Sequence, residues 1–192
     1  MSKLDRLHQA YIRDRNMPLW VGYLIISLIG AFIIFFIWFL IYICPSVFLS
    51  AMAKYDENHV LRQKTNYSCA TCSIYMLLQD ENVDVSLFRV GLTAKTMWYG
   101  TSTTNIAKAG QKFGFRIDRG MADFDSLMAA NAPAIVSYYE HGWPHAVYVR
   151  PDQEAGYLIV KNPANGLIFT RREFFSSHFF ANEVEAIVFY RR

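Results

Sequence analysis

The chain has 192 residues, of which 53% are hydrophobic and 18% are charged, and its formal net charge is +3 at pH 7. This length allows one domain of ordinary size and a short appended segment. The net charge argues neither for nor against a nucleic-acid partner, but no basic stripe with interleaved aromatic residues occurs, so we expect no nucleic acid as a partner. Three cysteines are too few for a disulfide framework, which excludes a small disulfide-stapled fold.

The apolar residues are concentrated near the N-terminus. No charged residue occurs from Pro18 to Ala53, and residues 19–44 form an almost unbroken apolar run. The run is longer than the roughly 20 residues that cross a bilayer as a helix, so we predict a single-pass transmembrane helix over 19–44. A cleaved signal peptide is the alternative, because Ala51-Met52-Ala53 resembles a cleavage site. Its apolar core would, however, be about twice the usual length.

Basic residues flank this segment unevenly. Four Lys or Arg residues lie within the first 16 positions, whereas the first basic residue after the segment is Lys54. Positively charged flanks tend to stay in the cytoplasm. We therefore predict a cytoplasmic segment at 1–18, a linker at 45–60 and a domain at 61–192. The chain would lie in the cytoplasmic (inner) membrane, with this domain outside the cytoplasm, in the periplasm if the cell has one.

The first half of the domain carries helical signals. Ser68 is a natural N-cap residue, and Ile74, Leu77 and Leu78 supply the apolar face of the helix that follows it. Gly114 is a C-cap signal for a later helix. Helices are predicted at 69–79, at 85–95, from 103 or 104 to 113, and at 124–130, with a short strand at 115–117.

The second half changes to the pattern of strands. Val, Ile and Tyr dominate four segments, and turn-forming residues such as Pro151-Asp152 and Asn165-Gly166 separate them. Helices followed by an antiparallel sheet indicate the α+β class. The strands are predicted at 133–140, 145–150, 157–163 and 185–191, with one helix at 171–180 before the last of them.

Cys69 and His145 provide a candidate nucleophile and its base. A cysteine attacks only as the thiolate, which a helix N-terminus favours, and an imidazole can take the thiol proton. Cys69 opens the helix predicted at 69–79, and His145 begins the strand predicted at 145–150. In papain-like folds the nucleophile heads a helix and the base lies on a facing strand.

Two other interpretations use the same residues. Cys69 and Cys72 form the sequence Cys-Ala-Thr-Cys, whose spacing also fits a redox pair. That motif normally follows the first strand of an alternating pattern, so we interpret Cys72 as a small buried helix residue. His141 and His145 have the spacing of helical metal ligands, but Pro144 disfavours a helix there. We expect neither a metal nor a cofactor.

From Arg62 onward, the chain resembles the bacteriocin-processing cysteine peptidases, or double-glycine leader peptidases. It is most similar to their stand-alone members rather than to those fused to an ABC transporter. The first motif of that family is Gln, five residues and a Cys that opens a helix, here Gln63 and Cys69. The second is a His that starts an apolar strand, here His145. The third is Asp-Pro followed by Gly, which corresponds here to residues 162–166.

The resemblance implies a papain-like peptidase and a role for each residue. Cys69 would attack the scissile carbonyl, and His145 would take its proton and later protonate the leaving amine. Gln63 and the backbone N–H of Cys69 would form the oxyanion hole. Asn162 would orient His145, although the family usually has Asp there, and an amide supports the imidazolium less by charge. The family also usually has Gly where this chain has Ala70.

The resemblance further implies cleavage of a leader or precursor peptide after Gly-Gly, in a secretion or maturation pathway. The chain has no GxxxxGK[ST] ATPase motif, so transport would be the work of a separate protein or secretion complex. The expected partners are therefore a substrate with a leader segment, the lipid bilayer and a separate transporter.

Trp98, Tyr99 and Trp143 lie in predicted loops and are candidates to line a substrate groove or, alternatively, to close a small core. A different function also stays open. The departures at Ala70 and Asn162 motivate a pseudo-peptidase that is weak or inactive, and that binds a peptide or scaffolds a membrane complex without cutting.

Overall fold

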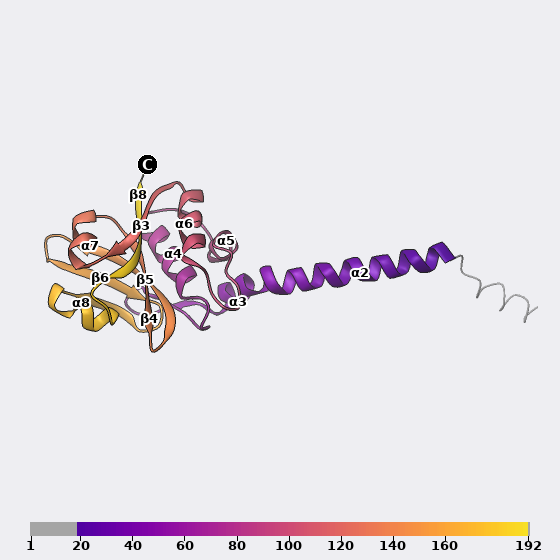
Figure 1. The fold of residues 1–192 in the computed structure, drawn as a ribbon, viewed down its shortest axis with the longest axis horizontal. Coiled ribbons are helices and arrows are strands. Elements are labelled where there is room, and N and C mark those ends of the chain that lie inside the picture. The colour runs from indigo at the N-terminus through magenta and orange to yellow at the C-terminus, as the bar shows by residue number, and fades with distance from the viewer. Residues whose placement is uncertain (1–18, 192) are drawn as a thin grey trace, which may run out of the picture. The chain divides into compact units, whose positions relative to one another are not determined.

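The structure is a computed structural model that describes residues 19–191 (Figure 1). The segment 1–18, predicted to be cytoplasmic, lies outside the described residues. The chain divides into two compact units, one ending at Leu40 and the other beginning at Ile41.

Helix α2 (Leu19–Tyr42) makes up the described part of the first unit and continues to the start of the second. Its stretch Trp20–Tyr42 is the one helix of the described chain that is long and apolar enough to cross a membrane. None of this stretch is buried inside the structure. Its apolar side chains are exposed, for example Ile34 with an exposed fraction of 71%. Helix α2 therefore qualifies as a membrane span by length and composition, two properties that a signal sequence near an N-terminus shares.

A second helix follows α2 after one residue and belongs to the larger unit. Helix α3 (Cys44–Met52) packs against helix α5 (Leu87–Thr93), and its Ser46 and Leu49 are buried. The approach is close, because a Cβ atom on Gly91 of α5 would lie 2.7 Å from the Ser46 Oγ. The segment 45–60 thus contains most of a packed helix and strand β1 (Lys54–Tyr55), which pairs with β2 (Leu61–Arg62) in a small two-stranded sheet.

The packing of α3 on α5 predicts a stability effect. Gly91→Ala is expected to destabilise the larger unit by about 1–3 kcal/mol, because the added methyl group would push Ser46 and its helix away. The measurement is the midpoint of thermal unfolding of the full chain in detergent. Gly120→Ala is the matched control, since a Cβ there meets nothing within 4 Å. Equal midpoints for the two variants would contradict close packing of α3.

The first three helices predicted for this half form as α4 (Cys69–Asp80), α5 and α6 (Thr103–Lys112). The predicted apolar face of α4 is confirmed, because Ile74, Leu77 and Leu78 are fully buried. The Ser68 side chain does not cap α4: its Oγ donates instead to the Thr65 carbonyl at 2.9 Å, closing the turn before the helix. The first N–H groups of α4, next to Cys69, therefore donate no hydrogen bond to the Ser68 side chain.

Six antiparallel strands form the main sheet in the order β3-β8-β4-β5-β6-β7. The strand predicted at 115–117 continues to Ala122, because it pairs with β8 along its whole length. Strand β7 was not predicted; it pairs with β6 after a tight turn in which Asn162 lies opposite Gly166. The strand bounds are β3 (Phe115–Ala122), β4 (Ala134–Glu140), β5 (Trp143–Asp152), β6 (Tyr157–Asn162), β7 (Gly166–Thr170) and β8 (Val184–Arg191).

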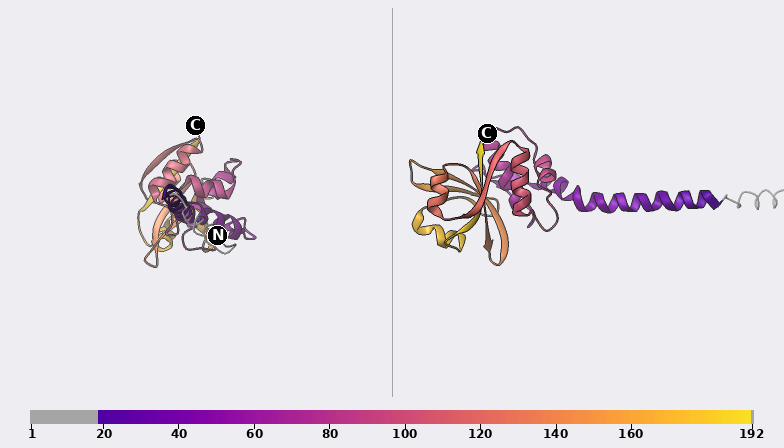
Figure 2. Two further views of the ribbon diagram at one scale, coloured as in Figure 1. Left: turned by 90° about the vertical axis from the view of Figure 1, so that its right-hand side faces the viewer. Right: turned by 45° about the horizontal axis from the view of Figure 1, so that its top comes forward.

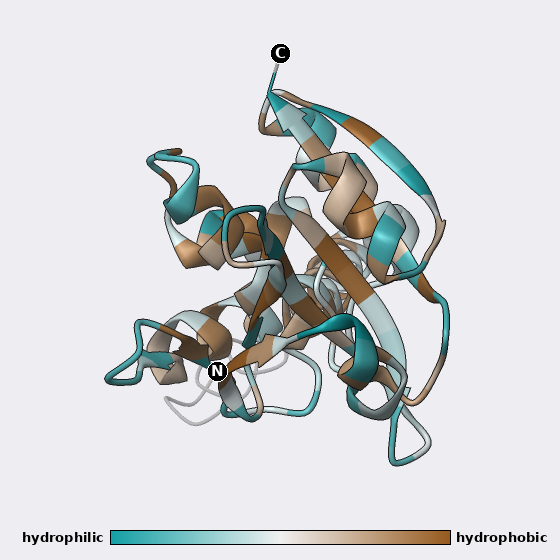
Figure 3. Cartoon of the chain, turned by 90° about the vertical axis from the view of Figure 1, so that its left-hand side faces the viewer, coloured by the Kyte–Doolittle hydropathy of each residue, from teal (hydrophilic) through white to brown (hydrophobic). Residues whose placement is uncertain are grey.

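Helices cover both faces of this sheet. Helix α4 packs on the face of β5 that presents Ala146 and Tyr148, whereas Val147 and Val149 belong to the cluster on the other face. That second face is covered by α7 (Phe124–Ala130) and α8 (Arg172–Phe179). Figure 1 shows these layers, Figure 2 shows them from two further directions, and Figure 3 shows the hydrophobic residues gathered on the central strands. The predicted α+β class, with helices first and an antiparallel sheet after them, is confirmed.

Candidate active site

The antiparallel pairing of β5 and β6 brings His145 and Asn162 together. His145 lies near the start of β5, and Asn162 is the last residue of β6. Both side chains are buried, with exposed fractions of 8% and 0%. The His145 Nε2 and the Asn162 Oδ1 are 2.8 Å apart, a normal hydrogen-bond distance.

The turn after β6 determines which atom of the Asn162 amide faces the histidine. The backbone N–H groups of Ala164 and Asn165 donate to the Asn162 Oδ1 at 2.8 and 3.3 Å. A backbone N–H can only donate, so this atom must be the amide oxygen. Because the oxygen accepts, the Nε2 of His145 carries a hydrogen. In the neutral imidazole, Nδ1 is then the atom that can accept a proton.

Cys69 interacts with this imidazole. It is the first residue of α4, and the Ser73 Oγ one turn later donates to the Ala146 carbonyl of β5 at 3.1 Å. Burial by itself lowers the pKa of His145. The hydrogen bond and charge of Cys69, the hydrogen bond of Asn162 and the charge of Glu140 oppose burial, and the net pKa is raised. The structure thus brings the predicted nucleophile and base close enough to interact, and the raised pKa extends the pH range over which the imidazole is protonated.

The same turn also holds the segment that carries Gln63. The Gln63 backbone N–H donates to the Pro163 carbonyl at 3.0 Å, and the Arg62 guanidinium donates to the Ala164 carbonyl. Gly166 closes this turn with a φ of +103°, and a Cβ there would lie 2.8 Å from the Arg62 Nη1. The site therefore depends on a glycine at this position for both its backbone conformation and its space.

The Gln63 side chain is partly buried and keeps unused hydrogen-bonding capacity. Its amide oxygen is buried and has no partner among the described residues. A buried amide oxygen that the fold leaves unsatisfied can accept a hydrogen bond from a group that enters the site. The sequence motifs identified Gln63 but not Arg62. Arg62 holds the Gln63 segment against the turn after β6 through its bond to Ala164, which lies 102 positions later in the chain.

Cys72 is fully buried one turn along α4. Burial, and then the charge of Cys69, raise the pKa of its thiol to about 12, although a hydrogen bond with Ser68 lowers it. Cys72 is therefore a protonated thiol at neutral pH, and both it and Cys69 are free. The interpretation of Cys72 as a buried helix residue is confirmed.

The three predicted groove residues lie at the surface. Trp98, Tyr99 and Trp143 have exposed fractions of 46%, 83% and 77%. The Trp98 ring contacts Tyr67, two residues before Cys69, with ring centroids 5.3 Å apart. Trp143 lies two residues before His145. Trp98 therefore lies against the segment that carries the nucleophile, and Trp143 belongs to the strand that carries the base.

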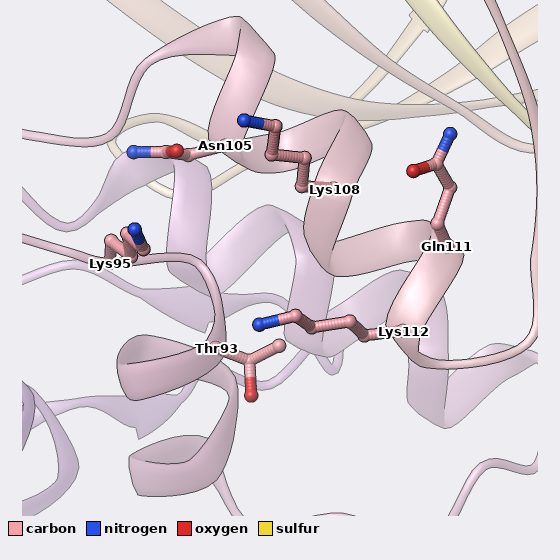
Figure 4. A pocket seen from close by; sticks show the side chains of 6 residues that line it. All are labelled: Thr93, Lys95, Asn105, Lys108, Gln111 and Lys112. Carbon is pink, nitrogen blue, oxygen red and sulfur yellow. The ribbon is translucent and has the colours of Figure 1, made fainter.

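Figure 4 shows a separate cavity, of about 300 Å³, between α5 and α6. Its lining is polar and basic, and none of the predicted site residues contributes to it. The lining residues are Thr93, Lys95, Asn105, Lys108, Gln111 and Lys112.

A helical layer on an antiparallel sheet, with a cysteine heading the first helix of the layer and a histidine on the facing strand, is the arrangement of papain-like cysteine peptidases. The sequence pattern of the peptidase C39 family matches residues 57–185, which is more than half of the chain. The chain therefore belongs to the peptidase C39 family.

Solved structures show the same fold. The chain is similar to a double glycine motif protease from an AMS/PCAT transporter in complex with the leader peptide, with 18% identity, a TM-score of 0.56, and coverage of 74% of this chain and 94% of that chain. It is also similar to the peptidase domain of Streptococcus ComA, a bi-functional ABC transporter involved in a quorum sensing pathway. For this domain the identity is 22%, the TM-score is 0.57, and the coverage is 69% of this chain and 98% of that chain. No match was found among curated proteins.

Proposed function

We propose that this C39 family protein is a membrane-anchored cysteine endopeptidase that cleaves a leader or precursor peptide after Gly-Gly. The observation that carries the proposal is the imidazole of His145, which Asn162 holds through Nε2 and whose pKa is raised by the neighbouring Cys69. A thiol, a base and an orienting group in contact are the requirement for nucleophilic catalysis by cysteine.

The proposed reaction follows from these contacts. The Cys69 proton passes to the Nδ1 of His145, and the thiolate attacks the scissile carbonyl carbon. The oxyanion accepts hydrogen bonds from the Cys69 backbone N–H and the Gln63 amide. The C–N bond then breaks as His145 protonates the leaving amine. Water, deprotonated by His145, hydrolyses the thioester and regenerates the thiol.

Asn162 acts in this scheme by orientation. Its oxygen is held by two backbone N–H groups, so it can keep the hydrogen-bearing Nε2 of His145 in place throughout the cycle. The neutral amide cannot offset the charge of the imidazolium. The Asn found in place of the usual Asp is therefore compatible with an oriented base and leaves the charge to be balanced by another group.

The membrane arrangement is part of the proposal. Helix α2 would be the anchor within the span 19–44, and α3 begins two residues after α2 ends. The segment 1–18 would lie in the cytoplasm and the domain 61–192 outside it. A separate transporter or secretion complex would then deliver the substrate, and the exposed Trp98, Tyr99 and Trp143 would line its path to Cys69.

The direct test is cleavage of synthetic peptides by the full chain in lipid nanodiscs. One peptide carries a leader that ends in Gly-Gly before its cargo residues, and its matched control has Ala-Ala there. We expect mass spectrometry to show one cut, directly after the second Gly, and none in the control. The Cys69→Ala variant is the negative control, because any cleavage that it shows would come from a contaminating peptidase.

The same assay separates the peptidase from a pseudo-peptidase. Cleavage of both peptides would contradict the Gly-Gly specificity but not the peptidase activity. Binding of the Gly-Gly peptide without cleavage would instead support the pseudo-peptidase that Asn162 motivates.

A further inference from the structure

A carboxylate approaches the proposed base from the β4–β5 hairpin. Glu140 is the last residue of β4, and its Oε2 lies 3.7 Å from the His145 Nε2. Tyr138 of β4 pairs directly with His145 of β5. Glu140 lies two residues further along β4, so its side chain is on the same face of the sheet and is a diagonal neighbour of His145. Its side chain is 20% exposed, which leaves the charge only partly screened by water.

The turn after β6 holds this carboxylate in place. The Asn165 Nδ2 donates to the Glu140 Oε1 at 2.9 Å, while the Asn165 backbone N–H donates to the Asn162 Oδ1 at 3.3 Å. One residue thus binds both the amide and the carboxylate that face His145. Because one carboxylate oxygen is tied to Asn165, the other is directed at the imidazole.

We propose that Glu140 is a positioning residue for catalysis: it supplies the negative charge that Asn162 lacks and stabilises the imidazolium form of His145. This inference rests on the proposed function and deepens it. In the pattern typical of the family, one Asp would both orient the ring and balance its charge. Here the amide of Asn162 orients the ring through a 2.8 Å hydrogen bond, and Glu140 balances the charge from 3.7 Å.

The other groups around His145 leave this role to Glu140. Cys69 of α4 is the proposed nucleophile, and Asn162 of β6 is neutral. Burial, followed by the charge of Glu140, raises the pKa of Tyr138, so its phenol is neutral. His178 of α8 faces Tyr138, and burial lowers its pKa, although the charge of Glu140 opposes this shift. Among these groups, Glu140 is the carboxylate.

The sign of the expected effect follows from the pKa of His145. The charge of Glu140 is one of the causes that raise it. Its removal should lower this pKa, so the imidazolium would persist over a narrower range of pH. At mildly acidic pH the thiolate of Cys69 depends on that imidazolium, whereas at alkaline pH it forms without it.

The experiment measures alkylation of Cys69 by iodoacetamide across this pH range, in the full chain, with the modified peptide identified by mass spectrometry. Glu140→Gln is expected to slow alkylation about tenfold at mildly acidic pH, a change of about 1.4 kcal/mol, and little at alkaline pH. A purely structural role would slow or speed alkylation at every pH. Glu154→Gln is the matched control, because Glu154 is exposed in the β5–β6 turn.

Two further variants keep the test decisive if Glu140→Gln folds poorly. Asn165→Ala removes the side-chain donor that holds Glu140 but keeps the backbone N–H to Asn162, and should give a smaller loss at acidic pH. Glu140→Gln combined with Asn162→Asp returns one carboxylate to the imidazole and should restore the acidic rate.

Superimposable pH profiles for wild type, Glu140→Gln and Asn165→Ala would overturn the inference and leave the proposed function standing. A wild-type Cys69 that resists alkylation at every pH would overturn the proposed function, and the inference with it.

Discussion

Replacing Cys69 with alanine is expected to lower peptide cleavage at least about a thousandfold, because no other described group near His145 can form the thioester intermediate. Binding of the peptide should be retained, since alanine removes only the sulfur atom. The measurement is kcat/KM for the Gly-Gly peptide, together with its Kd for the inactive variant.

The control for this prediction is Cys72→Ala. Cys72 is fully buried and its thiol stays protonated, so its loss should leave a small cavity and nearly unchanged cleavage. If Cys72→Ala abolished cleavage as completely as Cys69→Ala does, with the fold intact, Cys72 would also be required for cleavage, and the assignment of Cys69 as the one nucleophilic cysteine would be contradicted.

Replacing Gln63 with alanine is expected to lower kcat by about 10²–10³, with little change in KM, because an oxyanion donor interacts with the transition state more than with the substrate. The backbone contacts of this segment should survive the substitution. The Gln63 N–H to Pro163 is a main-chain bond, and Arg62 donates to Ala164 independently of the Gln63 side chain.

Two controls separate oxyanion stabilisation from a loss of structure. Alkylation of Cys69 forms no oxyanion, so the Gln63→Ala variant should react with iodoacetamide at the wild-type rate. Gln79→Ala removes an exposed amide at the far end of α4, which bonds only locally to the Val83 carbonyl, and should leave kcat unchanged. A slower alkylation in Gln63→Ala would show that the substitution disturbs Cys69 itself and would contradict the assigned role.

Local sequence signals located most of the elements correctly. Helix α4 was predictable because its apolar residues recur at helical spacing, and β5 because Val and Tyr alternate along it. Strand β7 was missed, since Gly166–Thr170 becomes a strand only by pairing with β6 across the turn. The excess length of β3 has the same origin, because its second half is extended only by its pairing with β8.

The sequence by itself determined the apolar segment, the α+β class and the three motifs that carry Gln63 with Cys69, His145 and Asn162. These are properties of neighbouring residues, through periodicity, capping and spacing. The tertiary structure alone decided that the turn after β6 fixes the Asn162 amide, and so the tautomer of His145. It also decided that Glu140 faces the same ring. The contacts of His145 with Asn162 and with Glu140 depend on strand register. Strand register joins positions far apart in the chain and leaves no mark in local composition.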